Sequence, residues 1–216
     1  MSLESLSSLL VILLVLANFQ MLGTSRIAQC LRMVAVQALL LGVFPLLRQW
    51  GELTAEVIVV AAASTLLKAV VLPAMLGRAM RAAEVRREVE PMVGFTVSLL
   101  AGIALLAASV ALGARLELPG PIASRFFVPV ALFTILVGLF VVVTRRKAIT
   151  QVIGYLAIEN GIYAFGLATA VRAPLLVELG VLLDIFAAVF VMGIAILHIR
   201  REFDHIDTDR LTMLKE

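Results

Sequence analysis

Residues 151–166 read QVIGYLAIENGIYAFG, an apolar stretch that carries a carboxylate and an amide side by side near its middle. The stretch is composed to avoid water, yet Glu159 is a group that prefers to be charged. What this carboxylate does depends on where it lies relative to the rest of the chain.

The whole chain shares the apolar character of this stretch. Of its 216 residues, 62% are hydrophobic and 15% are charged, whereas a soluble domain averages about 45–50% apolar and about 25% charged residues. The apolar residues fall into runs of roughly 20, the length at which a helix spans a bilayer core of about 30 Å. A strand pattern is absent, as expected where lipid permits only helices and closed barrels. The sequence therefore predicts an all-α, polytopic membrane protein.

Seven runs are predicted to cross the membrane, the first as a retained helix because MSLESLSS lacks the basic region of a secretory signal. No internal repeat or long linker divides the chain, so we expect one membrane domain over residues 1–216. Within it, residues 1–125 form a four-helix part and residues 126–216 a three-helix part with a tail. The predicted spans are Leu3–Gly23, Ala28–Leu47, Glu56–Gly77, Met92–Gly113, Phe126–Thr144, Ala148–Ala170 and Pro174–His198.

The fifth and sixth predicted spans are joined by a very short connection, TRRKA, and must therefore be antiparallel neighbours. The sixth span contains Gly154, Gly161 and Gly166, which thin the helix and favour close packing.

Lysine and arginine gather in alternate connections. Of the eighteen, thirteen fall in one set of loops and the C-terminal tail, four fall in the other set, and Lys68 lies inside a span. The positive-inside rule places the richer set in the cytoplasm, so the N-terminus is predicted outside and the C-terminus inside. The net charge of +3 then reflects topology, not nucleic-acid binding. The thirteen are Arg26, Arg32, Arg78, Arg81, Arg86, Arg87, Arg145, Arg146, Lys147, Arg200, Arg201, Arg210 and Lys215; the four are Arg48, Arg115, Arg125 and Arg172.

Three ionisable residues lie deep inside separate predicted helices. At about 1.5 Å per residue, Glu159 lies about 16 Å from the start of its helix, and Asp184 and Lys68 lie about 15 and 18 Å from the starts of theirs. All three are therefore expected near the bilayer midplane. A charge there costs roughly 2.5–3.5 kcal/mol on insertion scales, so each residue must face a neighbour, a partner subunit or water.

Two interpretations of these charges stay open. In the structural one, Lys68 pairs with Glu159 or Asp184 and holds helices together. In the functional one, the three residues belong to a proton or sodium path, because burial disfavours the charged carboxylate while a nearby lysine favours it. The interpretations overlap, since a relay also needs the pairing.

Residues near the three charges refine this expectation. Pro73 follows Lys68 by five positions, removes a backbone donor and predicts a bend. Asn160 points about 100° away from Glu159 in a regular helix, so its amide could donate to a carboxylate on another helix but not to Glu159 itself. Glu178 lies near the outer end of its span and is expected to reach the lipid headgroups.

Catalytic and metal-binding signatures are missing from the sequence. The chain has one cysteine and two histidines, too few to hold an iron–sulfur cluster or a nickel site. Cys30 is expected to be a buried free thiol, and His198 is expected to cap a helix end. We therefore predict no metal, no cofactor and no redox or catalytic centre in this chain; any catalysis belongs to partner subunits.

Two regions are candidates for docking those partners. The fourth span presents small residues at Gly94, Ser98 and Gly102, which permit close packing either within this subunit or against another. The charged loop at residues 78–91 and the tail at residues 201–216 are candidate docking sites for a peripheral redox arm, or they lie against lipid headgroups.

The C-terminal part carries a family resemblance. Residues 136–165, LVGLFVVVTRRKAITQVIGYLAIENGIYAF, resemble the small three-helix K subunit of respiratory complex I and its antiporter counterpart, with an apolar helix, a basic turn and a membrane glutamate near an asparagine. Residues 182–208 resemble that family's third helix and tail. The family's first glutamate falls at Leu156, and Glu159 follows one turn later on the same face. With seven predicted spans, the chain resembles component E of hydrogenase-4 and formate hydrogenlyase-type complexes.

This resemblance implies a non-catalytic membrane subunit of a complex-I-like oxidoreductase in a bacterial or archaeal plasma membrane. Its partners would be antiporter-like and complex-I-like membrane subunits. Glu159 and Asp184 would then belong to a midplane ion path. A purely structural anchor is the alternative, and a stand-alone transporter is disfavoured by the lack of an inverted repeat.

The predicted topology can be tested with reporter fusions. Fusions after Arg146 and after Leu214 should report the cytoplasm, and fusions near Gly120 should report the outside, because basic loops are retained on the cytoplasmic face. A cytoplasmic signal at Gly120 would contradict the seven-span arrangement.

Overall fold

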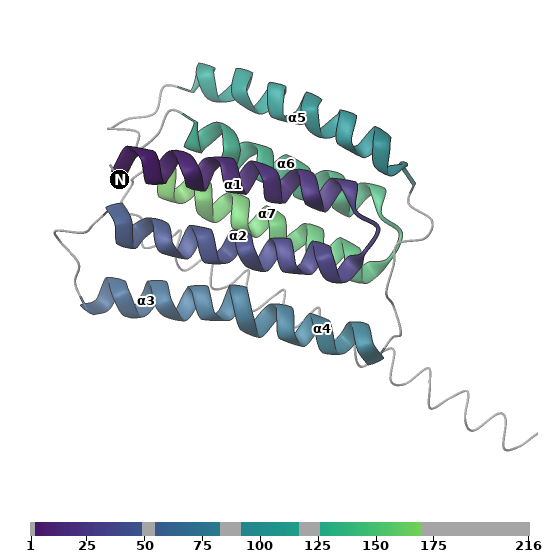
Figure 1. Ribbon diagram of the computed structural model, residues 1–216, viewed down its shortest axis with the longest axis horizontal. Coiled ribbons are helices and arrows are strands. Elements are labelled where there is room, and N and C mark those ends of the chain that lie inside the picture. The colour runs from purple at the N-terminus through teal and green to yellow at the C-terminus, as the bar shows by residue number, and fades with distance from the viewer. Residues whose placement is uncertain (1–2, 49–54, 83–91, 117–125, 170–216) are drawn as a thin grey trace, which may run out of the picture.

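The computed structural model describes residues 3–48, 55–82, 92–116 and 126–169, and these fold into a bundle of helices that lie side by side (Figure 1). The segments α3, η1 and α4 follow one another without interruption, so they act as a single long helix with a π-helical turn in its middle. The elements are α1 (Leu3–Gly23), α2 (Ile27–Arg48), α3 (Ala55–Leu66), η1 (Leu67–Val71), α4 (Leu72–Ala82), α5 (Phe95–Arg115), α6 (Phe127–Thr144) and α7 (Ala148–Thr169).

The first six predicted spans correspond to helices, with bounds close to those expected. Among the described residues, five helices are long and apolar enough to cross a membrane: Ser5–Gly23, Ile27–Phe44, Ala62–Arg81, Phe95–Arg115 and Phe127–Thr144. Helix α7 is 22 residues long but carries Glu159 and Asn160 in its middle, and it is not one of the five. The chain is thus a polytopic membrane protein. The seventh span, Pro174–His198, lies outside the described residues, so the count of seven and the orientation stay predictions.

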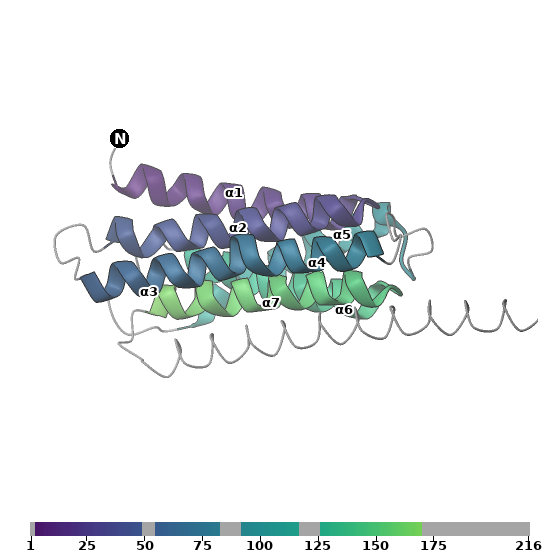
Figure 2. The same cartoon turned by 90° about the horizontal axis from the view of Figure 1, so that it is seen from below.

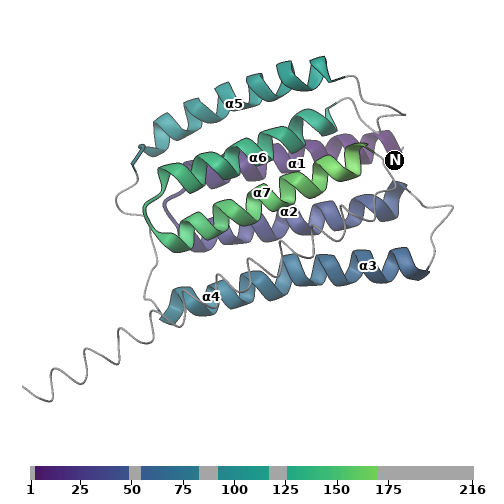
Figure 3. The same cartoon turned by 180° about the vertical axis from the view of Figure 1, so that it is seen from behind.

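The helices form successive layers. In Figure 1, α5 lies on one outer side, α1 and α6 come next, then α2 and α7, and the long α3–α4 helix lies on the opposite side. The reverse view in Figure 3 shows the same order, and in the view from below in Figure 2 the α3–α4 helix lies in front, with α1 and α2 on one side and α7 on the other. Helices α6 and α7 therefore pack among α1, α2 and α5, which joins the two sequence parts into one bundle.

The short connection after α6 turns the chain back so that α6 and α7 are antiparallel neighbours, as predicted. Their backbones touch. A Cβ atom added at Gly138 would meet the carbonyl oxygen of Gly154 and the nitrogen of Ile158, each at 2.7 Å, and one added at Gly161 would meet the nitrogen of Ile135 at 2.7 Å. Glycine at these positions is what permits the contact, as expected for helices that associate in lipid.

The small-residue face of α5 packs within the subunit. A Cβ atom at Gly102 would lie 2.6 Å from the Leu22 side chain of α1, and one at Gly113 would lie 2.7 Å from Pro129 of α6. Ser98 is buried on this face. The opposite face of α5 exposes large apolar side chains. Of the two possibilities left open by the sequence, the structure therefore shows packing inside this chain.

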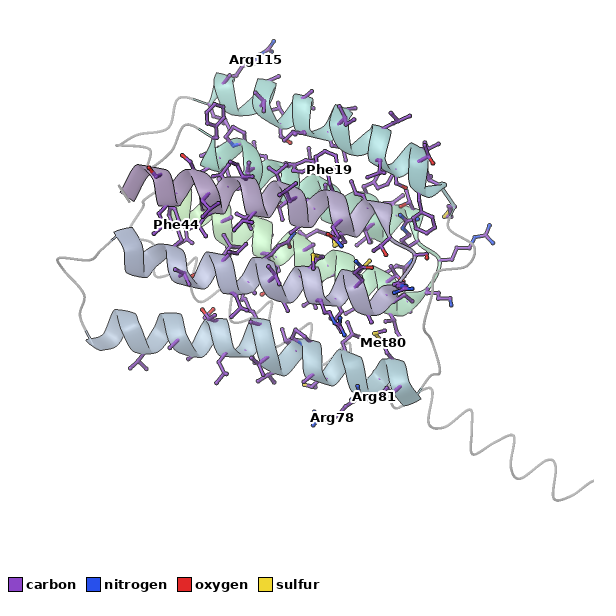
Figure 4. The ribbon with its side chains drawn as sticks, in the orientation of Figure 1. Phe19, Phe44, Arg78, Met80, Arg81 and Arg115 are labelled. Atoms are coloured by element: carbon purple, nitrogen blue, oxygen red, sulfur yellow. The ribbon has the colours of Figure 1, made fainter. Side chains whose placement is uncertain are left out.

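Arg145 has a different role from the one that charge counting gave it. Its guanidinium is buried and donates to the Leu22 carbonyl at 3.2 Å, the Val93 carbonyl at 3.2 Å and the Ser98 hydroxyl at 3.3 Å, and it lies over the Phe95 ring at 4.7 Å. It thereby ties the end of α1 and the start of α5 to the α6–α7 turn. At the same end of the bundle, Arg78 and Arg81 point outward from α4, whereas Arg115 ends α5 at the other end (Figure 4).

The backbone contact between α6 and α7 should make the protein sensitive to an added methyl group at Gly138. Alanine replacing glycine in a helix gains about 1 kcal/mol of intrinsic propensity, but at Gly138 the added methyl group meets backbone that cannot move aside. We expect Gly138→Ala to lower the thermal unfolding midpoint in detergent. Gly77→Ala is the matched control, because the nearest atoms there are 3.8 Å away and the propensity gain should prevail. Equal midpoints for the two variants would contradict backbone contact.

Candidate functional site

The buried apolar side chains form two clusters, one toward each end of the bundle. The cluster near the α6–α7 turn includes Leu22, Leu76 and Ile153, and the other includes Leu14 and Phe127. In Figure 4, Met80 of the first cluster and Phe44 of the second lie toward opposite ends.

A layer of polar side chains lies between the two clusters. One or two residues on each of five helical elements contribute to it, and none of them is more than 7% exposed. We call this set the polar layer: Asn18 of α1, Gln37 of α2, Lys68 of η1, Thr134 of α6, and Glu159 and Asn160 of α7.

At one end of the polar layer, Lys68 and Glu159 form an ion pair. The lysine Nζ lies 2.7 Å from the glutamate Oε1, with side-chain exposures of 7% and 3%. Depth in the sequence predicted that Lys68 would pair with Glu159 or Asp184, and the structure shows the pair with Glu159. Asp184 lies outside the described residues, as do Glu178, His198 and the residues beyond 82 of the 78–91 loop.

The lysine is presented from an irregular turn of its helix. The Leu72 amide bonds to the Leu67 carbonyl, five residues back, so the helix widens by one residue around Lys68. Pro73 follows directly and has no amide hydrogen to give to the preceding turn. The irregularity expected from this proline therefore takes the form of a π-helical turn.

The ion pair has an aromatic neighbour. The Lys68 Nζ lies 5.2 Å from the centroid of the Tyr163 ring, which is one helical turn beyond Glu159 on α7. Removing two charges from water costs several kcal/mol per ion. The contacts with the carboxylate and with the face of the ring offset part of that cost for the ammonium group.

The rest of the polar layer is a chain of hydrogen bonds that crosses the bundle. Asn160 Nδ2 donates to the Val34 carbonyl at 3.0 Å and to Gln37 Oε1 at 3.5 Å, and Gln37 Nε2 donates to Asn18 Oδ1 at 3.0 Å. Asn18 Nδ2 donates in turn to Thr134 Oγ1 at 2.9 Å. Helices α7, α2, α1 and α6 are thereby connected through side chains alone. We call these four residues the amide chain.

Asn160 has partners other than the carboxylate that the sequence suggested. Its amide donates to a backbone carbonyl and to Gln37. The reasoning from sequence also missed Asn18, Gln37, Thr134 and Tyr163. The signal for the first two was present, since an amide in the middle of an apolar span needs a buried partner just as a charge does.

Among the described residues, no group of three or more histidine, cysteine, aspartate or glutamate side chains gathers where it could hold a metal ion. Cys30 is buried, and its sulfur lies 3.6 Å from the Met21 carbonyl oxygen. The chemistry that the site offers is therefore that of one buried ion pair and a hydrogen-bonded chain beside it.

Known proteins match the chain over two different extents. Residues 126–216 match the family NADH-ubiquinone/plastoquinone oxidoreductase chain 4L. The uncharacterized protein Rv0085 of Mycobacterium tuberculosis is 36% identical over 206 residues, which are 94% of this chain and 93% of that protein. Hydrogenase-4 component E of Escherichia coli K12 and of Shigella flexneri is 40% identical over 86 residues, 40% of each chain. The chain belongs to the same family as Rv0085, and its C-terminal part is similar to hydrogenase-4 component E and to chain 4L. No solved structure matches it significantly.

The extent of the chain 4L match divides the ion pair between two parts of the chain. Glu159 lies within the region that matches chain 4L, on α7, whereas Lys68 precedes that region. Asn18 and Gln37 also precede it, and Thr134 lies inside it. The polar layer is thus built jointly by the chain 4L region and the preceding four-span region.

We expect replacement of Lys68 and replacement of Glu159 to lower the thermal stability of the protein by different amounts. Lys68→Met leaves a buried carboxylate without its counter-charge, a change that costs about 3–5 kcal/mol in buried pairs. Glu159→Gln leaves an amide oxygen that can still accept from the lysine. We expect the thermal midpoint in detergent to fall much further for Lys68→Met. The double variant Lys68→Met/Glu159→Gln should recover part of the loss, and simple additivity of the two single effects would contradict the pairing.

Proposed function

We propose that this chain is a non-catalytic integral membrane subunit of a complex-I-like, energy-converting oxidoreductase of the group 4 hydrogenase or formate hydrogenlyase type. The similarity of the C-terminal part to hydrogenase-4 component E and to chain 4L of NADH-ubiquinone/plastoquinone oxidoreductase supports this assignment. In such an assembly the electron-transfer centres belong to other subunits. This chain contributes to the movement of protons or sodium ions through the membrane.

The buried ion pair between Lys68 and Glu159 carries the second half of the proposal. A proton that reaches Glu159 neutralises the carboxylate and removes the attraction that holds the lysine. Occupation of the carboxylate and separation of the pair are therefore linked. Sodium would act in the same way, because it competes with the ammonium group for the carboxylate oxygens. The pair lies in a layer of low dielectric constant, where the interaction between charges is stronger than in water. Binding of a proton or of a sodium ion therefore changes the energy of the pair strongly.

Asp184 is proposed as the next acidic group along the path, and Glu178 and His198 as supporting groups toward the ends of the last span. Partner membrane subunits are proposed to cover lipid-facing sides of the bundle. The loop at residues 78–91 and the C-terminal tail are proposed to meet a peripheral redox arm. We place the protein in a bacterial or archaeal plasma membrane.

A purely structural role is the second candidate, and one observation favours it. The ion pair joins η1 to α7, so it also holds the long outer helix against the centre of the bundle. A pair that serves only as a helix contact has no proton to exchange, so a neutral replacement that still accepts a hydrogen bond from the lysine should leave ion translocation per assembled complex unchanged.

Glu159→Gln distinguishes the two roles. The amide keeps the shape and some hydrogen bonding but has no titratable proton, so an ion path should be interrupted while the complex still assembles. We expect co-purification with other membrane subunits at wild-type yield and a loss of ion translocation of about 100-fold, typical of removing an acid–base group. Thr150→Val, which alters a buried hydroxyl on the same helix near its first turn, is the matched control. An assembled Glu159→Gln complex with full coupled activity would leave only the structural role.

A further inference from the structure

We propose that the amide chain of Asn18, Gln37, Asn160 and Thr134 is the positioning element of the Lys68–Glu159 pair. It sets the rotation of α7 about its own axis and so keeps the carboxylate turned toward the lysine. This inference rests on the proposed function, because it names the residues that hold the proposed ion-path pair in place.

Two backbone carbonyls fix the donor-to-acceptor direction of every hydrogen bond in the amide chain. Asn160 Nδ2 faces the Val34 carbonyl at 3.0 Å, and Asn18 Nδ2 faces the Leu14 carbonyl at 3.0 Å. A carbonyl oxygen only accepts, so each of these amides must present its nitrogen there. Gln37 lies between them and can satisfy both only with its oxygen toward α7 and its nitrogen toward α1.

At Thr134, the last residue of the amide chain, the hydrogen bonds run in the same direction. The Thr134 hydroxyl accepts from Asn18 at 2.9 Å and donates its own hydrogen to the Val130 carbonyl at 2.8 Å. All donors therefore point the same way, from α7 through α2 and α1 to α6. No amide can rotate alone without setting two donors or two acceptors face to face in a buried layer, so the chain resists any single displacement.

Helix geometry connects this chain to the ion pair. Glu159 and Asn160 are consecutive, so their side chains leave α7 about 100° apart. One faces η1 and the other faces α2, as their partners show. A rotation of α7 that withdrew Asn160 from α2 would also turn Glu159 away from Lys68. Holding Asn160 in place therefore also holds Glu159 in place.

Substitutions along α6 provide a matched test. Thr134 and Thr144 are both buried on α6, and each donates to the carbonyl four residues back, but the described contacts of the amide chain reach only Thr134. Thr134→Val removes the end of the chain, and Thr144→Val removes an equivalent hydroxyl outside it. Gln37→Met keeps the side-chain length and removes both central links.

Two measurements are made on the full chain in its assembled complex. The first is ion translocation per assembled complex, which we expect to fall about tenfold in Gln37→Met, less in Thr134→Val and not at all in Thr144→Val. The second is an infrared difference spectrum between two pH values, in which the carboxyl band of Glu159 is identified by its loss in Glu159→Gln. That band should shift in Gln37→Met and stay in place in Thr144→Val.

These outcomes separate positioning from mere stability and from the proposed function itself. A stability role alone would lower the yield of complex but leave translocation per complex and the Glu159 band unchanged, which would overturn the inference. Wild-type translocation in Gln37→Met beside an inactive Glu159→Gln would also overturn it while the proposed function stands. Full activity in Glu159→Gln would refute the proposed ion path, and a band shift in Gln37→Met would still support positioning.

Discussion

A polar group inside a membrane protein must find its partner within the protein, and this constraint shapes the centre of the bundle. The six residues of the polar layer lie between two apolar clusters, where water is not at hand to replace a lost contact. Each unpaired group there would cost about 1–3 kcal/mol, more if charged. The ion pair and the amide chain meet this demand together, and in doing so they join α1, α2, η1, α6 and α7 at one level.

Close packing between α6 and α7 determines which way the polar residues of α7 can point. Gly154 and Gly161 are seven residues apart, so they share one face of α7, and that face touches α6. At about 100° per residue, Glu159 leaves the helix roughly 150° away from this glycine face, toward η1. Asn160 leaves it at an intermediate angle, toward α2. The glycines thus determine the direction in which the Glu159 carboxylate points, and the amide chain opposes rotation of α7 away from that direction.

Much of this arrangement could be predicted from sequence, because run length and depth are read along one dimension. The six described spans and the equal depth of Lys68 and Glu159 follow from counting residues. Depth alone left Glu159 and Asp184 as equal partners for the lysine, since it gives the level of a side chain but not its direction around the helix. Arg145 shows the same limit. Its place in a basic turn predicted a topological charge, whereas the free carbonyls that make it a clamp come from α1 and from the residues before α5.

Lys68 precedes Glu159 in the sequence, and this order affects how the ion pair forms when the chain enters the membrane. The carboxylate of Glu159 lies in the region that matches chain 4L, and its partner Lys68 precedes that region on the same polypeptide. The ammonium group is therefore synthesised before the carboxylate, and both enter the bilayer as one chain. An intramolecular partner is present at high effective concentration, which an independently made subunit is not. Glu159 thus reaches its buried site with a counter-charge already available, and stability of the pair does not wait for assembly with a partner.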